Sequence, residues 1–398
     1  MPSVKLGNGE NGTQLRVRDG GLESGQVRLE YGAHVVLDTK GKRLITANAS
    51  ANTTEPYPEF SRLFLQACDG YRASQGDFKI LANVSSFRDV AAVPFLGVDG
   101  VGLIRTEYFF LKAAKVACLR KVLVDNDPSA LAALQEYQYQ DFLKVFKALP
   151  NNQSFPITVR LLDPKPSELL TADERDKLRQ RAKLAVDPRG VQILKTTPHL
   201  YAAQANAIFR AAKEVCLPND LRILVPFVSV GEEMKTARMA VEDGAAQAGF
   251  VRRFSVGAML ETFSALTNIG DVVPHADFAN VGPKDLTIEF LGGLREHQTD
   301  AIKTLLKERY GDKVPWPDER PYEHLHSALK DRLKVALHTA REIKPAFEVI
   351  VCGDEIHDST SSVAFALQET NGISVPADKR NVAQTKLVVC NQILTLKP

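Results

Sequence analysis

The chain has 398 residues, 44% of them hydrophobic and 25% charged, which is typical of a globular protein with two or more folded units. Its formal net charge of +2 and the lack of basic runs interleaved with aromatic residues argue against a nucleic-acid partner. No apolar run has the length of a membrane span and the first residues lack the apolar core of a signal peptide. We therefore expect no membrane contact and a cytoplasmic protein.

The first part of the chain predicts a small β-rich appendage. Residues 1–25 are rich in glycine, asparagine and charge and are interpreted as a loose arm. Alternating apolar and polar residues on either side of residues 38–42 predict a β-hairpin. Residues 48–58 have the composition of a polar linker, and the pattern from residue 60 to about 74 predicts a helix. We therefore assign residues 1–57 to an N-terminal arm and appendage, and residues 58–398 to a larger domain.

The larger domain alternates short apolar runs with helical segments. The runs predict eight strands at Ile80–Val84, Gly102–Ile104, Ile157–Leu162, Ile223–Val228, Val256–Leu260, Phe278–Val281, Val349–Cys352 and Ile373–Val375. Eight strand and helix units in one continuous domain predict a (β/α)8 TIM barrel of the α/β class. A doubly wound open sheet is the alternative, because the number of strands is uncertain by one or two at this stage. The five cysteines lack CxxC spacing, which favours free thiols.

Charged residues follow most of the predicted strands. Active sites of such barrels lie at the C-terminal strand ends, where this chain has Arg105, Glu107, Arg160, Asp163, Glu261, Lys284, Asp285, Cys352 and Asp354. Glu261 and Asp285 follow consecutive strands of a predicted βαβ unit, so their carboxylates are expected to converge. Oxygen ligands of this kind suit Mg²⁺, which predicts a metal site for an anionic ligand. The alternative is that both are solvated acids at strand ends.

Six segments in this order resemble one family. They are GVGLIRTEYFF, ITVRLLDPKPSELL, RGVQILKTTPHLYAAQANAIFRAA, VGAMLETFSA, NVGPKDLTIEFLGGLR and VIVCGDEIHDSTSSVAF. They are similar to the barrel domain of the phosphoenolpyruvate-utilising enzymes, which include pyruvate phosphate dikinase, phosphoenolpyruvate synthase and enzyme I of the sugar phosphotransferase system. The segment VRLEYGAHVVLDTKGKRLI resembles the last hairpin of the phosphohistidine domain that precedes this barrel, so residues 1–57 are interpreted as its remnant.

The resemblance implies roles for specific residues. Four arginines, Arg105, Arg160, Arg189 and Arg295, match positions that hold phosphate, and bidentate guanidinium contacts suit phosphate oxygens. Glu261 and Asp285 match the Mg²⁺ ligands. Cys352 matches the thiol that moves a proton at the methylene carbon of the pyruvate enolate, a role that nearby cations favour by lowering a thiol pKa. The alternative for Cys352 is a small buried hydrophobic side chain.

Two departures from the family pattern affect the substrate site. The family has Thr-Asn before the metal aspartate, whereas this chain has Pro283 and Lys284. Lys284 could bind the substrate carboxylate, pair with Glu261 or Asp285 and oppose Mg²⁺, or form a Schiff base with a keto acid. Asp354 replaces the family's glutamate after Cys-Gly and is assigned, with Lys284, to the substrate-binding residues.

These features predict an Mg²⁺-dependent enzyme acting on phosphoenolpyruvate or a related enolpyruvate or keto acid. The sequence has no phosphohistidine motif of its own, so a partner protein carrying the histidine is one alternative. A non-catalytic metabolite-binding protein is another, because Lys284 stands beside a metal ligand. The resemblance also implies a homodimer.

Overall fold

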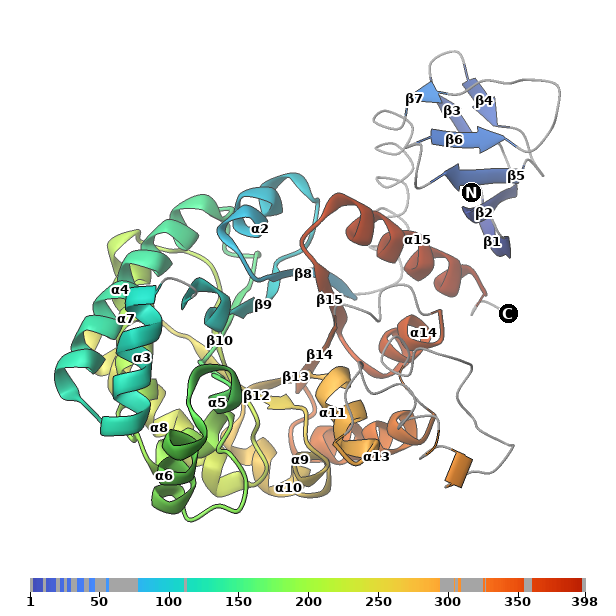
Figure 1. Ribbon diagram of the computed structural model, residues 1–398. Helices are drawn as coiled ribbons and strands as arrows, with labels where there is room; N and C mark the ends of the chain where they lie inside the picture. Colours follow the sequence, from blue (N-terminus) through green and yellow to red (C-terminus); the bar gives the residue numbers. More distant parts are fainter. Residues whose placement is uncertain are drawn as a thin grey trace.

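The fold is a closed barrel of eight parallel strands surrounded by helices (Figure 1). The computed structural model describes residues 78–110, 113–293, 327–353 and 360–395, single positions at 304, 307, 308 and 325, and short strands within residues 3–56. The barrel strands are β8 (Lys79–Val84), β9 (Val101–Arg105), β10 (Ile157–Arg160), β11 (Leu221–Val225), β12 (Ser255–Leu260), β13 (Phe278–Val281), β14 (Glu348–Cys352) and β15 (Gly372–Pro376). All eight predicted strands are present, and the predicted TIM barrel is confirmed.

Side chains alternate between the interior of the barrel and the surrounding helices. Along β12, for example, Met259 belongs to the interior cluster, whereas Ala258 and Leu260 pack in the layer beneath the helices. Successive strand residues face opposite sides, so an apolar run such as SVGAML serves both layers. The interior cluster comprises Leu81, Leu103, Leu224, Met259, Phe278, Ile350 and Cys352. The barrel is therefore a packed core whose open end lies above these side chains.

Strand β11 differs from its predicted position. The apolar run predicts a strand over Ile223–Val228, but the strand begins at Leu221 and ends at Val225. Pro226 has no backbone N–H to donate to a neighbouring strand, so pairing stops before it. The next residue, Phe227, has a positive φ of 53°, which turns the chain away from the barrel. This turn lies at the mouth of the barrel and contributes to the site.

The helices form the outer layer in chain order. They are α2 (Phe87–Ala92), η1 (Val93–Phe95), η2 (Thr106–Phe110), α3 (Ala113–Asp125), α4 (Pro128–Ala148), α5 (Pro166–Leu169), α6 (Ala172–Ala182), η3 (Gly190–Lys195), α7 (Leu200–Glu214), α8 (Gly231–Ala248), α9 (Phe263–Thr267), α10 (Ile269–Val272), η4 (Val273–His275), α11 (Pro283–Phe290), α13 (Ser327–Ile343), α14 (Thr360–Glu369) and α15 (Lys379–Thr395). Sequence signals explain several ends: Asp127 caps α4, and Thr171 with Glu174 forms a capping box on α6.

The two ends of the domain meet where the barrel closes. Strands β8 and β15 pair in parallel, with Lys79 opposite Gly372. The Ser374 hydroxyl donates to Asn83 Oδ1 at 2.6 Å, and Asn83 Nδ2 donates to the Ser374 carbonyl at 3.1 Å. These buried side chains are 291 positions apart in the sequence. The seam between the first and last strands is thus held by reciprocal polar contacts as well as by the ladder.

A network of charged side chains fills the interior at the N-terminal ends of the strands. Arg222 donates to Asp220 at 2.7 Å through Nε and to both oxygens of Glu348, at 2.8 and 3.2 Å, through Nη1 and Nη2. Lys79 adds a 3.3 Å contact to Glu348. We call these four residues the base network. Its guanidinium has an acceptor for every nitrogen, so it closes this end of the barrel with matched charges.

The N-terminal segment is richer in strands than the sequence indicates. Residues 1–25 were expected to be a loose arm, but β1 (Ser3–Gly9) pairs antiparallel with β2 (Gly12–Arg18), placing Val4 opposite Val17 and Leu6 opposite Leu15. This expectation was wrong because the glycines and asparagines mark the turn between two alternating strands. Five further strands follow: β3 (Leu22–Ser24), β4 (Val27–Leu29), β5 (His34–Asp38), β6 (Arg43–Thr46) and β7 (Glu55–Pro56). One sheet has the strand order β1-β2-β5-β6-β7, and β3 and β4 form a second sheet.

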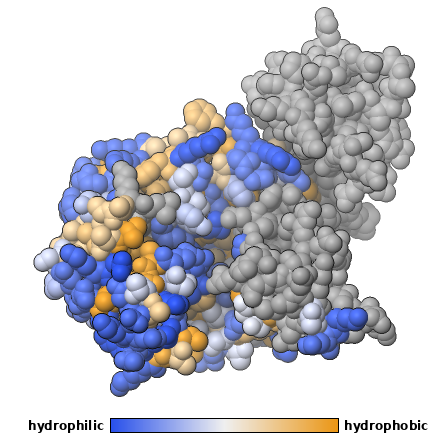
Figure 2. All heavy atoms as spheres, in the orientation of Figure 1, coloured by the Kyte–Doolittle hydropathy of each residue, from blue (hydrophilic) through white to orange (hydrophobic). Residues whose placement is uncertain are grey.

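Strands β5 and β6 pair antiparallel around residues 39–42, where alternation predicts a hairpin. The helix expected over residues 60–74 lies outside the described residues. On the face of the barrel shown in Figure 2, hydrophilic side chains predominate, with small apolar patches between them. Across the described helices, none is both long enough and apolar enough to span a bilayer.

Candidate active site

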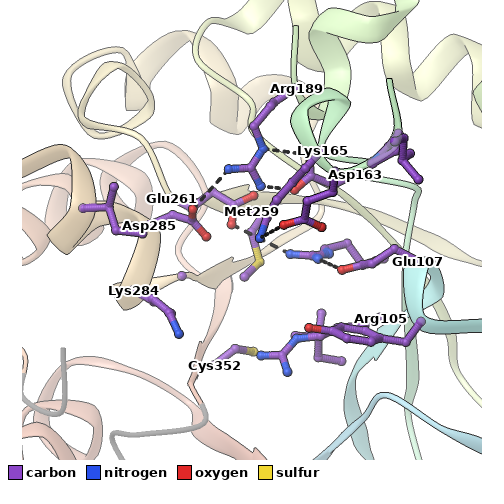
Figure 3. Close-up of a pocket in the computed structure, with 18 of the residues that line it drawn as sticks. Arg105, Glu107, Asp163, Lys165, Arg189, Met259, Glu261, Lys284, Asp285 and Cys352 are labelled. Carbon is purple, nitrogen blue, oxygen red and sulfur yellow. Dashed lines mark hydrogen bonds and ion pairs between the residues drawn. The ribbon is translucent and has the colours of Figure 1, made fainter. Parts of the chain in front are cut away.

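A cavity of about 280 Å³ lies at the C-terminal ends of the barrel strands. Nine of the residues singled out in the sequence line it: Arg105, Glu107, Arg160, Asp163, Arg189, Glu261, Lys284, Asp285 and Cys352. They come from five strands and the loops that follow them. Figure 3 shows Arg105, Arg189, Glu261, Lys284, Asp285 and Cys352 converging from different sides. Two further predicted residues, Arg295 and Asp354, lie outside the described residues.

Two arginines end neighbouring strands at the same level. Arg105 ends β9 and Arg160 ends β10, and the two residues are partners in the strand register. Arg160 is 7% exposed and ion-pairs with Glu107 through Nη2, while its Nη1 lies 3.9 Å from Glu261 Oε2. Burial lowers the pKa of Arg160, but the charge of Glu107 and then that of Glu261 raise it above its ordinary value. The guanidinium therefore stays charged deep in the cavity.

Arg189 is held in a fixed position above the mouth. It precedes η3 and donates to Asp163 through Nε at 3.3 Å and also through Nη2. Its Nη1 lies 3.3 Å from Asp285 Oδ1, so it bridges two carboxylates. The guanidinium carbon also lies 3.8 Å from the centroid of the Phe227 ring. Stacking and bidentate pairing leave this side chain little rotational freedom.

Glu261 is the most deeply buried acid of the cavity. Only 1% of its surface is exposed. One oxygen, Oε1, accepts the backbone N–H of Phe227 at 2.9 Å. The other, Oε2, has no hydrogen-bond partner among the described residues. Burial, and then the charge of Asp285, raise the pKa of Glu261 to about 8. A buried carboxylate oxygen without a donor is a position where a cation would be strongly favoured.

Gly282 allows this carboxylate to approach the following loop. A Cβ at Gly282 would lie 2.8 Å from the Cβ of Glu261 and 3.0 Å from its Oε2. Those contacts are too short for any side chain, so the glycine is required by the close packing of β12 against the turn after β13. The turn leads directly into α11, which carries Lys284 and Asp285 in its first turn. The glycine thereby brings the two carboxylate-bearing segments together.

The carboxylates fit a magnesium ion with few protein ligands. Within the described part of the chain, no group of three or more His, Cys, Asp or Glu residues has the arrangement of a metal site. Mg²⁺ commonly takes one or two carboxylates and completes its octahedral shell with water and substrate oxygens. The unsatisfied Oε2 of Glu261 and the neighbouring Asp285 supply such a pair. Asp285 currently accepts from Arg189, so its second role would need that contact to loosen.

Cys352 lies opposite Arg160 in the barrel. It ends β14, and four strand positions separate β14 from β10 in the closed sheet. Its thiol is buried, and Sγ accepts a hydrogen bond from Asn280 Nδ2 at 3.2 Å. The same amide nitrogen donates to the Gly102 carbonyl at 2.8 Å, which fixes the Asn280 side chain. In the view of Figure 3, Cys352, Arg105 and Lys284 lie on the side away from Arg189.

Several residues of the cavity had no assigned role at the level of sequence. Glu107 and Asp163 were noted as strand-end acids, but their pairing with Arg160 and Arg189 was not foreseen. Lys165, which lines the cavity and lies 3.1 Å from Glu168, was not singled out. Asn280 and Phe227 were placed inside apolar runs. An asparagine two positions after an inward-facing Phe278 is a signal for an interior polar contact.

The chain is a closed barrel of eight parallel strands, and arginines, carboxylates and a buried thiol line one cavity at the C-terminal ends of its strands. The match to the family described as "PEP-utilising enzyme, PEP-binding domain" covers residues 68–392. The chain therefore belongs to the PEP-utilising enzymes, and the suspected resemblance is confirmed.

Curated relatives of this chain include pyruvate, phosphate dikinases. The protein from Treponema pallidum (strain Nichols) is 26% identical over 395 residues, covering 85% of this chain and 42% of the relative. The protein from Clostridium symbiosum is 26% identical over 376 residues, covering 86% and 41%. The chain thus spans about two fifths of the length of these relatives. A solved HpcH/Hpal aldolase/citrate lyase family protein from Burkholderia cenocepacia J2315 aligns at 15% identity over 84% of this chain and 98% of that one, with a TM-score of 0.37.

Proposed function

We propose that this barrel is an Mg²⁺-dependent enzyme that binds phosphoenolpyruvate or a related enolpyruvate or keto acid and moves a proton at its C3 carbon. One observation carries the proposal. A shell of arginines, a pair of carboxylates and a buried thiol line a single cavity, although they come from strand ends far apart in the sequence. Family membership supports phosphoenolpyruvate as the ligand class.

Each group has a distinct task in this proposal. Arg105, Arg160 and Arg189 hold the phosphate or another anionic group, because fixed guanidinium groups match its oxygens. Glu261 and Asp285 hold Mg²⁺, which when bound supplies positive charge beside the carbonyl oxygen of the substrate. Lys284 binds the carboxylate of the substrate from the first turn of α11.

Cys352 takes the proton. From β14 it faces the arginine side of the barrel mouth, so a three-carbon acid held by the cations would present its C3 to Sγ. As a thiolate it would remove a methyl proton of pyruvate, leaving the electron pair of the broken C–H bond on the enolate, and it would return the proton in the reverse step. Asn280 orients the sulfur through its 3.2 Å hydrogen bond.

Deuterium exchange tests this assignment without any phosphoryl acceptor. In heavy water with Mg²⁺, the protein should exchange the methyl protons of pyruvate, followed by proton NMR. Cys352→Ala should slow exchange by about a hundredfold or more, the usual scale of lost acid–base catalysis. Cys216→Ala is the matched control, because this exposed free thiol lies between α7 and β11, before the strand begins and outside the cavity lining, and the variant should exchange at the parent rate. Parent-rate exchange in Cys352→Ala would assign the base to another group.

Two alternatives predict other outcomes. If a partner protein supplies a phosphohistidine, the parent should transfer the phosphoryl group of phosphoenolpyruvate only when that partner is added. If the chain only binds metabolites, phosphoenolpyruvate and Mg²⁺ should raise its melting temperature while no pyruvate exchange occurs. The cationic side chain of Lys284 beside Asp285 is the observation that favours this second alternative. The homodimer expected from the resemblance stays a prediction, and light scattering would test it by measuring the molar mass in solution.

A further inference from the structure

We propose that Phe227 is a positioning residue that sets both the anion-binding arginine and the metal-binding glutamate of the cavity. This inference rests on the proposed function. Phe227 follows β11 and belongs neither to the predicted site nor to the cavity lining among the described residues. It acts through two side chains that do line the cavity, Arg189 and Glu261.

The backbone of Phe227 serves the glutamate. Its φ of 53° lies in the left-handed region, which bulky side chains rarely adopt. In that conformation its N–H points to Glu261 Oε1 at 2.9 Å, the one hydrogen bond that Glu261 accepts from a described residue. The bond turns the carboxylate so that Oε2 is left without a donor. An unfavourable backbone conformation that is retained at such a position indicates a functional constraint.

The ring of Phe227 serves the arginine. It lies under the guanidinium of Arg189, 3.8 Å from ring centroid to guanidinium carbon. A cation stacked on an aromatic face is held in one plane, here the plane in which Nη1 faces Asp285 at 3.3 Å. In this position Arg189 lines the cavity, with its side chain 18% exposed.

The chain around Arg189 is fitted to the same turn. The Val191 N–H donates to the Pro226 carbonyl at 3.1 Å. A Cβ at Gly190 would lie 2.5 Å from that carbonyl oxygen and 2.6 Å from the Cβ of Phe227. Gly190 has a positive φ of 50°, as Phe227 has one of 53°. The two residues that meet in this close contact thus share the left-handed backbone conformation. The turn at 226–227 is therefore the base on which the Arg189 loop rests.

The two contacts can be separated by substitution. Phe227→Leu keeps the N–H and much of the bulk but removes the aromatic face. We expect its affinity for inorganic phosphate, measured by calorimetry, to fall about tenfold, while its affinity for Mg²⁺ alone stays within about twofold of the parent. Phe227→Tyr retains the ring and should restore phosphate affinity. A purely structural role would instead lower the melting temperature and weaken both ligands together.

A double-mutant cycle identifies the route of the effect. If the ring acts through Arg189, then Phe227→Leu should cause no further loss of phosphate affinity in an Arg189→Ala background. Additive losses, or parent-like phosphate binding in Phe227→Leu, would overturn the proposal. Phe227→Met replaces the leucine variant if that variant does not fold. A parent protein that binds neither phosphate nor Mg²⁺ would instead refute the function on which this inference rests.

Discussion

The barrel contains two charge networks, a partly buried one at its base and a more deeply buried one at its mouth, and they are built differently. At the base, each nitrogen of Arg222 has an acceptor, and none of the four base-network side chains has a buried polar atom without a partner in the described structure. At the mouth, Glu107 Oε2, Arg160 Nε and Glu261 Oε2 are all buried without one. The protein itself supplies partners for the base network, whereas these three buried polar atoms of the mouth have no hydrogen-bond partner among the described residues.

One glutamate from each network, Glu348 at the base and Glu261 at the mouth, shows the same difference. Burial raises the pKa of Glu348, but the hydrogen bonds and charge of Arg222, followed by those of Lys79, outweigh burial and leave the pKa below its ordinary value. Burial and Asp285 raise the pKa of Glu261 to about 8. The fold therefore stabilises the charged form of Glu348, whereas it disfavours the charged form of Glu261 despite the neighbouring Arg160. A carboxylate whose charge the protein compensates is typical of a structural ion pair, whereas a buried carboxylate with a strongly raised pKa is typical of a functional site.

The largest effect should come from opening the base network. Arg222→Ala removes three donors and leaves Glu348 and Asp220 without their main partner. We expect the free energy of unfolding to fall by about 3 kcal/mol, because the Glu348 side chain is 21% exposed and its charge would lose most of its compensation. Urea unfolding measures this loss. The exposed Lys235, 3.8 Å from Glu232, provides the control: Lys235→Ala should change stability by less than about 1 kcal/mol.

At the mouth, removing a charge should stabilise the protein instead of destabilising it. A carboxylate whose folded pKa is raised contributes its full stability below its ordinary pKa of 4.5, and this contribution is lost as the pH rises towards 8. Without divalent cations, Glu261→Gln should therefore be more stable than the parent at pH 8, by on the order of 2 kcal/mol, and should differ little at pH 4.5. Thermal unfolding of both proteins across this pH range measures the difference. Parallel pH profiles would show that the fold does not raise the pKa of Glu261.

The smallest effect concerns the cation itself. At pH 8, Mg²⁺ at about ten times its dissociation constant should stabilise the parent by about 1.4 kcal/mol, and a chelator should reverse the gain. Glu261→Gln and Asp285→Asn should abolish it. Arg222→Ala should retain it, because the base network is remote from the cavity lining. An equal gain in Asp285→Asn would remove Asp285 from the metal ligands.

The sequence was informative where a local pattern determines the position of a residue. Apolar runs ended by polar residues located the barrel strands, and the rule that sites lie at C-terminal strand ends brought Glu261, Asp285 and Cys352 together. The sequence did not predict contacts between side chains from segments that are distant in the chain. The stacking of Phe227 on Arg189 depends on a positive φ that a run reading ILVPFV conceals. The pairing of Glu107 with Arg160 depends on strand register, which sequence alternation alone does not fix.

The seam between β8 and β15 bears on the order in which the protein forms. Ser374 and Asn83 are 291 positions apart in the sequence, so the barrel cannot close until nearly the whole domain has left the ribosome. Contacts between residues so far apart in the sequence slow folding, because the entropy cost of closing the long loop is incurred before the contacts can stabilise the structure. Until then the first strands expose one open edge. Circular permutation that links the end of α15 to the start of β8 and opens the chain in a surface loop would bring β15 and β8 closer in the sequence, and it should speed refolding without altering the mouth.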